Sequence, residues 1–244
     1  NCKVLSPKTK LLKKLVTFCP MDKAENVRKA LFSVGGGNIG NYDQCSFNTE
    51  GLGTFRGNEA THPYVGKKGK LHYEKELRIE TIYSEHLESR ILKALFENHP
   101  YEEVPYDIYP LGNEHGQIGS GMIGELMHGE DEKDFLKRIK KVMKADSVRY
   151  TKLMGKKVRK VAVCGGSGSF LLGNAIGANA DVFITSDFKY HSFFDTENKL
   201  VIADIGHYET EQFTGEIFLE LIQRKFPTFA LHLSKINTNP INYL

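Results

Sequence analysis

The sequence predicts an α/β protein in two parts: an α+β module over residues 11–111, followed by an α/β layered domain over residues 117–244. In the module, the pattern of apolar residues predicts the order β-α-β-β-α-β, which is typical of a ferredoxin-like antiparallel sheet with both helices on one face. From Lys157 onward, strands that are apolar on both faces alternate with helices. That alternation indicates a mixed sheet covered by helices on both sides. A polar, glycine-containing segment at 112–119 is the predicted linker.

The module begins with a predicted strand at 11–18. Asp22, with Glu25 three residues later, predicts a capping box at the start of a helix. The apolar positions of this helix recur at helical spacing until the glycines at 35–37 end it. The remaining predicted elements are strands at 42–47 and 53–56 around a turn at 48–51, a long strand at 70–83, a helix beginning at Ser84, and a strand at 104–109.

The second domain is predicted to contain five strands and four helices. The predicted strands are 118–127, 158–163, 182–185, 200–205 and 229–233, and the predicted helices are 131–143, 171–176, 190–194 and 210–223.

Composition excludes several classes of protein. Hydrophobic residues make up 40% and charged residues 26%, and the net charge of +3 is too small to indicate binding to nucleic acid or membrane. No apolar run approaches the roughly 18 residues that a membrane span needs. The four cysteines are too far apart for a zinc knuckle or a disulfide framework, which favours free thiols in a reducing compartment. We therefore expect a cytoplasmic protein without a signal peptide, and its first residue, Asn1, indicates a fragment or processed product.

The most informative stretch is 206–211, which directly follows an apolar strand. His207 and Glu211 are four residues apart at a helix start, so they share one face of that helix. An imidazole and a carboxylate at this spacing can hold one metal ion, and the carboxylate can bridge to a second. The alternative is an ordinary surface pair.

Asp187 and His191 repeat this arrangement after the preceding strand. Ligands gather at the carboxyl ends of strands in open α/β sheets, so the two pairs support each other. For Asp187 we favour the alternative of a helix N-cap. For His191, a role beside the metal ligands or facing substrate is weighed against a partly buried histidine bonded to backbone.

Three further segments contain polar or glycine residues in loops. The segment 164–169 either presents backbone N–H groups to an anion or forms a tight strand-to-helix turn. His62 and His99 both precede prolines and have no second ligand at metal spacing, so we interpret them as structural. The compact polar loop at 99–103 could still bind something small.

Several long motifs resemble a known family, the NIF-three-like dinuclear-metal proteins, which are commonly named GTP cyclohydrolase type-two homologues. The segments 34–47, 50–55 and 99–107 resemble the family's inserted domain, which is similar in fold to PII and CutA-like trimeric proteins. The segments 162–168, 184–191 and 204–211 resemble its C-terminal half. The resemblance covers nearly the whole chain.

The resemblance implies two divalent metal ions (zinc, manganese or iron) per full-length subunit, held inside a toroidal hexamer. Its C-terminal ligands fall on His207 and Glu211. The family's other ligands, a tandem histidine pair and an aspartate, belong to an N-terminal half that would precede Asn1. No His-His pair occurs in this sequence, so the site is predicted to be incomplete in this chain.

Two functions follow as predictions. The first is a metal-dependent hydrolase with a dinuclear centre, including GTP cyclohydrolase-type opening of a nucleotide ring, with His191 as the candidate for proton transfer or substrate binding. The alternative is a non-enzymatic metal-binding or regulatory scaffold, whose PII-like module binds a small effector or drives assembly as a trimer or hexamer.

Overall fold

The computed structural model describes residues 2–244, which divide into two compact units. Unit 1 joins the N-terminal residues through Pro7 with Gly116–Leu244, and unit 2 is Lys8–His115. The chain is a mixed α/β protein with two separate sheets and several helices, as predicted.

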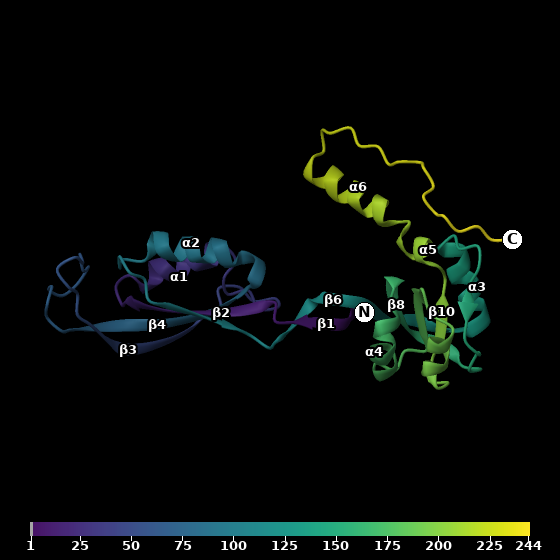
Figure 1. The fold of residues 1–244 in the computed structure, drawn as a ribbon, viewed down its shortest axis with the longest axis horizontal. Coiled ribbons are helices and arrows are strands. Elements are labelled where there is room, and N and C mark those ends of the chain that lie inside the picture. The colour runs from purple at the N-terminus through teal and green to yellow at the C-terminus, as the bar shows by residue number, and fades with distance from the viewer. Residues whose placement is uncertain (1) are drawn as a thin grey trace. The chain divides into compact units, whose positions relative to one another are not determined.

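Unit 2 contains a four-stranded antiparallel sheet in the order β3-β4-β2-β5 (Figure 1). Its strands are β2 (Leu12–Pro20), β3 (Phe47–Phe55), β4 (His72–Ser84) and β5 (Tyr106–Pro110). Its helices are α1 (Ala24–Ser33), the short 3₁₀ helix η1 (Glu85–Leu87) and α2 (Glu88–Asn98). The chain thus follows the predicted order β-α-β-β-α-β, and both α-helices lie on one face of the sheet.

The core of unit 2 lies between this sheet and the two helices. Val27 and Leu31 of α1 and Ile91 and Leu95 of α2 are fully buried against the sheet. Burial of each such side chain contributes about 1.5–3 kcal/mol to the stability of the folded state. Burial of one helix face accounts for the apolar residues that recur at helical spacing in α1.

Two local predictions in unit 2 are wrong. Residues 48–51 form no turn but lie inside β3, where Asn48 pairs with Ile79 and Gly51 with Glu76. Pairing with the neighbouring strand overrides the local turn preference of this segment. The predicted strand at 42–47 reduces to a single bridge between Ile39 and Tyr42 before β3 begins.

The predicted helix caps are also wrong. Lys23, not Asp22, is in the N-cap position of α1, and no side chain there bonds to the helix. Ser84 precedes η1 rather than α2 and makes no cap hydrogen bond. The ends of these helices are instead fixed by packing and by backbone bonds such as that from Lys23 N to Pro20 O (2.9 Å).

Unit 1 contains the mixed sheet, in the order β1-β6-β8-β9-β10-β7. Its strands are β1 (Cys2–Thr9), β6 (Glu114–Asp131), β7 (Arg149–Tyr150), β8 (Lys157–Ser167), β9 (Val182–Ser186) and β10 (Val201–Asp204). The central strands β8, β9 and β10 run parallel, whereas β6 and β7 pair antiparallel with them. The carboxyl ends of three strands therefore meet at one edge.

Helices cover both faces of this sheet. The helical segments are α3 (Glu132–Val142), η2 (Ser169–Leu171), α4 (Leu172–Gly177), η3 (His191–Thr196), α5 (His207–Glu211) and α6 (Thr214–Lys225). Phe183 of β9 packs in one cluster with Leu172 of α4. The adjacent Val182 and Ile184 pack in a second cluster with Phe135 of α3. Successive β9 side chains point to opposite faces, so both faces are buried.

The C-terminal part differs from prediction. The predicted helix at 210–223 is divided into α5 and α6, and 190–194 forms the 3₁₀ helix η3. Residues 229–233, predicted as a strand, form none, and β7 occupies the outer edge of β10. No helix within residues 2–244 is long and apolar enough to cross a membrane.

Candidate metal centre

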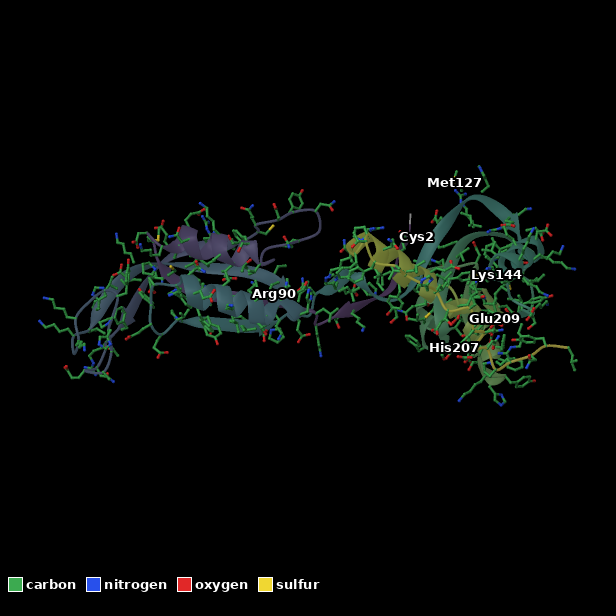
Figure 2. The ribbon with its side chains drawn as sticks, turned by 90° about the horizontal axis from the view of Figure 1, so that it is seen from above. Cys2, Arg90, Met127, Lys144, His207 and Glu209 are labelled. Atoms are coloured by element: carbon green, nitrogen blue, oxygen red, sulfur yellow. The ribbon has the colours of Figure 1, made fainter. Side chains whose placement is uncertain are left out.

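His207 stands at the carboxyl end of β10, beside the end of its parallel neighbour β9. Gly206, with φ of 99°, turns the chain from the strand into α5. A Cβ atom at Gly206 would overlap the buried carboxylate of Glu209, so this turn requires glycine. The turn places His207 as the first residue of α5. Figure 2 labels His207 and Glu209, two residues of this helix.

The imidazole of His207 lies between two carboxylates. Its Nδ1 is 2.5 Å from Oδ2 of Asp187, and its Nε2 is 3.3 Å from Oε2 of Glu211. The hydrogen bond to Asp187, supported by the charges of Asp187 and Glu211, raises the pKa of His207 above its ordinary value. About half of each of the three side chains is exposed to solvent. A divalent cation would therefore compete with a proton at Nε2.

Asp187 does not cap a helix, contrary to our prediction. It follows β9 directly with φ of 60°, while Tyr190 occupies the N-cap position of η3. Its carboxylate instead holds Nδ1 of His207, 20 residues away. A carboxylate on one ring nitrogen fixes the tautomer and the orientation of a histidine whose other nitrogen binds a metal. Asp187 thus directs Nε2 of His207 toward Glu211.

Asp204 ties the two strand ends together. It is 3% exposed and accepts hydrogen bonds from the backbone N–H groups of Phe188 (3.0 Å) and Gly206 (3.3 Å). Its carboxylate also forms an ion pair with Arg149 of β7. These bonds position the residues that flank Asp187 and His207. Sequence reasoning missed this role, although a charged residue inside an otherwise apolar strand was the available signal.

The end of β8 forms the third side of the site. The N–H of Gly166 donates to Oγ1 of Thr210 (2.8 Å), and that hydroxyl donates to the carbonyl of His207 (2.8 Å). A Cβ atom at Gly166 would lie 2.5 Å from Oε1 of Glu211. The segment 164–169 is therefore an irregular strand end that packs closely on α5. The N–H of Gly166 is used within the protein, which favours the turn over the anion-binding alternative.

Cys164, in the same segment, has little nucleophilic character. Burial and the nearby charge of Glu211 raise the pKa of its thiol. A thiol rather than a thiolate therefore predominates at neutral pH.

His191 lies four residues beyond Asp187, at the start of η3, and is exposed. Its ring contacts that of Tyr190 at a centroid distance of 5.2 Å. No hydrogen bond or ion pair joins it to Asp187, His207 or Glu211 among the described residues. Its part in proton transfer or substrate binding stays a prediction.

The described residues bring together the two predicted ligands, His207 and Glu211. Within 2–244, no group of three or more histidine, cysteine, aspartate or glutamate side chains is arranged to hold a metal ion. His207 and Glu211 offer one nitrogen and one carboxylate donor that face each other. Such a mixed donor pair suits zinc, manganese or iron.

Two histidines of unit 2, His99 and His62, differ in their contacts. His99 is buried, its Nε2–H donates to the carbonyl of Phe18 (3.0 Å), and its Nδ1 accepts from the N–H of Tyr101 (3.1 Å). His62 is exposed, and its backbone N–H donates to Glu102 (2.7 Å). The role of His99 is structural, as the sequence indicated, whereas that of His62 stays a prediction.

Comparison with known proteins gives a consistent result. The family model of Duf34/NIF3 (NGG1p interacting factor 3) matches residues 9–240. The chain is 38% identical to the GTP cyclohydrolase 1 type 2 homolog of Halalkalibacterium halodurans, over 100% of this chain and 67% of that protein. It is 34% identical to the Bacillus subtilis protein of the same name, over 99% of this chain and 66% of that one.

The solved structures agree. The crystal structure of a Bacillus cereus protein related to NIF3 superposes with a TM-score of 0.81 at 37% identity, over 100% of this chain and 66% of that one. The chain thus spans about two thirds of the length of the relatives it matches. On this evidence the chain belongs to the Duf34/NIF3 family.

Proposed function

We propose that this chain contributes one half of a dinuclear metal centre in a metal-dependent hydrolase. The observation that supports this is the imidazole of His207, oriented by Asp187 so that Nε2 faces Glu211 at the meeting point of three parallel strand ends. His207 and Glu211 would be direct ligands. Two divalent ions, when bound, supply a Lewis acid and lower the pKa of a water molecule.

The residues of this chain would support that chemistry by holding geometry. Asp187 keeps a proton on Nδ1 of His207, which leaves Nε2 as the donor atom. Thr210 and Gly166 fix the first turn of α5 against β8. The remaining ligands would come from the third of the protein that the relatives possess beyond the matched region.

Nucleotides are the substrate class that the relatives' name suggests, since they are called GTP cyclohydrolase 1 type 2 homologs. The specific reaction that we propose is hydrolytic ring opening of GTP. The candidate for proton transfer is the exposed His191.

The test is elemental analysis of this chain and of a version extended at its N-terminus to the length of its relatives. We expect the extended version to bind divalent metal tightly, and this chain to bind it weakly. His207→Ala should abolish tight binding, and Asp187→Asn should weaken it by about 10- to 100-fold. His232→Ala, which changes an exposed histidine outside the site, is the matched control.

Two outcomes would separate the parts of this proposal. Absence of metal in the extended version, even after reconstitution, would contradict the metal centre itself. Metal binding without turnover of GTP or related nucleotides, with zinc, manganese or iron, would contradict only the cyclohydrolase assignment.

Assembly as a trimer or hexamer stays a prediction. The mass of the protein in solution would check it.

A further inference from the structure

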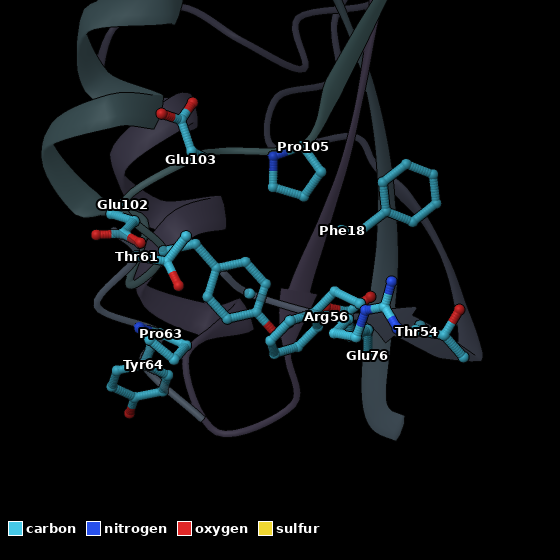
Figure 3. A pocket seen from close by; sticks show the side chains of 14 residues that line it. Phe18, Thr54, Arg56, Thr61, Pro63, Tyr64, Glu76, Glu102, Glu103 and Pro105 are labelled. Atoms are coloured by element: carbon cyan, nitrogen blue, oxygen red, sulfur yellow. The ribbon is translucent and has the colours of Figure 1, made fainter. Parts of the chain in front are cut away.

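Unit 2 contains a cavity of about 470 Å³ that is separate from the candidate metal centre (Figure 3). Residues of β2, β3 and β4 and of the two segments 56–64 and 101–105 line it, and all of them belong to unit 2. Its volume falls in the range of about 300–1,000 Å³ that is typical of small-molecule sites.

One wall of this cavity is aromatic. The rings of Phe55 and Tyr101 lie 6.2 Å apart between centroids, and those of Tyr64 and Tyr101 lie 6.3 Å apart. Phe18 adds a fourth ring to the lining. Aromatic faces carry partial negative charge, so this wall favours an apolar body and a positive charge held close to it.

The carboxylate of Glu76 lies in the same cavity and is only 9% exposed. The hydroxyl of Tyr101 donates to its Oε1 (2.7 Å). Burial, together with this hydrogen bond, raises the pKa of Tyr101, so the hydroxyl remains the donor and Glu76 the acceptor. A Cβ atom on Gly53 would overlap Oε2, so the carboxylate occupies space that only glycine leaves open.

Glu76 has no cationic partner among the described residues, since no lysine, arginine or histidine of 2–244 forms an ion pair with it. A buried carboxylate with incomplete compensation is costly. A ligand cation in the cavity would supply the missing charge.

The charges around the cavity point the same way. Glu102 and Glu103 join Glu76 in the lining, whereas Arg56, which is exposed, is the one basic residue that lines it within the described range 2–244. Three carboxylates against one guanidinium make the cavity electronegative and disfavour anionic ligands.

We propose that this cavity binds a small organic cation: a protonated amine on a flat aromatic body, with the ring against Phe55 and Tyr101 and the ammonium group against Glu76. This site goes beyond the proposed metal chemistry and does not depend on it. It would give the module a ligand of its own.

The test uses three indole probes and the full 244-residue chain. The chain contains no tryptophan, so indole fluorescence reports on the probe alone. Tryptamine carries a cation, indole-3-acetate an anion, and indole no charge. We expect tryptamine to bind at least about tenfold more tightly than indole-3-acetate, with indole between them.

Two substitutions locate the effect. Glu76→Gln keeps an acceptor for the Tyr101 hydroxyl and should remove the preference for the cation, whereas Phe55→Leu should weaken binding of all three probes. Glu97→Gln, an exposed carboxylate on α2 outside the cavity, should change nothing.

Three results would overturn the proposal: equal binding of tryptamine and indole-3-acetate, no saturable binding of any probe, or a folded Glu76→Gln protein that retains the preference. If Glu76→Gln fails to fold, the comparison of probes on the unaltered chain still decides the matter.

Discussion

The two units support their acidic groups in different ways. In unit 2, Glu76 is 9% exposed and is bonded to Tyr101 inside a cavity that the same unit builds completely. In unit 1, the side chains of Asp187, His207 and Glu211 are 44–52% exposed, and α6, which follows them, has no buried residue. The difference indicates that unit 2 builds its cavity from its own residues, whereas the proposed metal centre would need further donors beside His207 and Glu211.

The largest expected effect concerns the support of the exposed site. Asp204→Ala would leave the N–H groups of Phe188 and Gly206 without their buried acceptor. Each unpaired buried group costs about 1–3 kcal/mol, so we expect a loss of about 3 kcal/mol in the free energy of unfolding of unit 1. Urea denaturation gives the total, and hydrogen exchange shows which unit opens.

Asp195→Ala is the matched control, because Asp195 is an exposed aspartate in η3. Its effect should stay within about 0.5 kcal/mol. If Asp204→Ala increases hydrogen exchange in unit 2 as much as in unit 1, the two units unfold together. That result would contradict the view that each unit is stabilised separately.

The sequence predicted the elements whose apolar pattern reflects burial. It missed those whose structure depends on pairing with residues far away in the chain. The helices α1 and α2 were predicted correctly because burial of one face makes apolar residues recur at helical spacing. The strand β9 was predicted correctly because burial of both faces gives a short continuous apolar run. The segment 48–51 looks like a turn, yet it lies in β3 because it pairs with β4.

The candidate sites show the same limit. The spacing of His207 and Glu211 predicted that they face each other, since four residues make about one helical turn. Nothing local to Asp187 reveals that it holds a histidine 20 residues away. The placement of the Glu76 carboxylate over Gly53, on the neighbouring strand, follows from sheet register, which no short motif encodes.

An intermediate effect is expected where β8 packs on α5. Gly166 has φ of 61°, and a Cβ atom there would approach Glu211. Gly166→Ala should therefore cost about 1–2 kcal/mol of stability through its backbone alone. It should also displace Glu211, so that metal binding by the extended version weakens.

Gly173→Ala is the control, and we expect it to change stability in the opposite direction. Gly173 lies in α4 with nothing within 4 Å of its ideal Cβ position. Alanine there should stabilise the protein by about 0.5–1 kcal/mol, because glycine is a poor helix former. Thermal unfolding of both variants checks the pair, and equal shifts would show that close packing at Gly166 is unimportant.

The smallest expected effect is a change in the stability of unit 2 with pH, which arises from His99 within that unit. Burial lowers the pKa of His99 below its ordinary value of 6.5, although the bond to Phe18 opposes this shift. The folded state therefore binds fewer protons than the unfolded chain just below pH 6.5. The contribution of His99 to stability is complete above that pH and declines as the pH falls toward the lowered pKa.

The hydrogen bonds of His99 show what its protonation would disturb. Nδ1 of His99 accepts from the N–H of Tyr101, so a proton on Nδ1 breaks that bond and disturbs the residue whose hydroxyl supports Glu76. Urea midpoints on either side of pH 6.5 measure the effect. His99→Gln should flatten the pH dependence, whereas His86→Gln, at an exposed histidine of η1, should leave it unchanged. A pH dependence that survives in His99→Gln would place its source outside the 99–103 loop, and unit 2 would then owe its acid sensitivity to other groups.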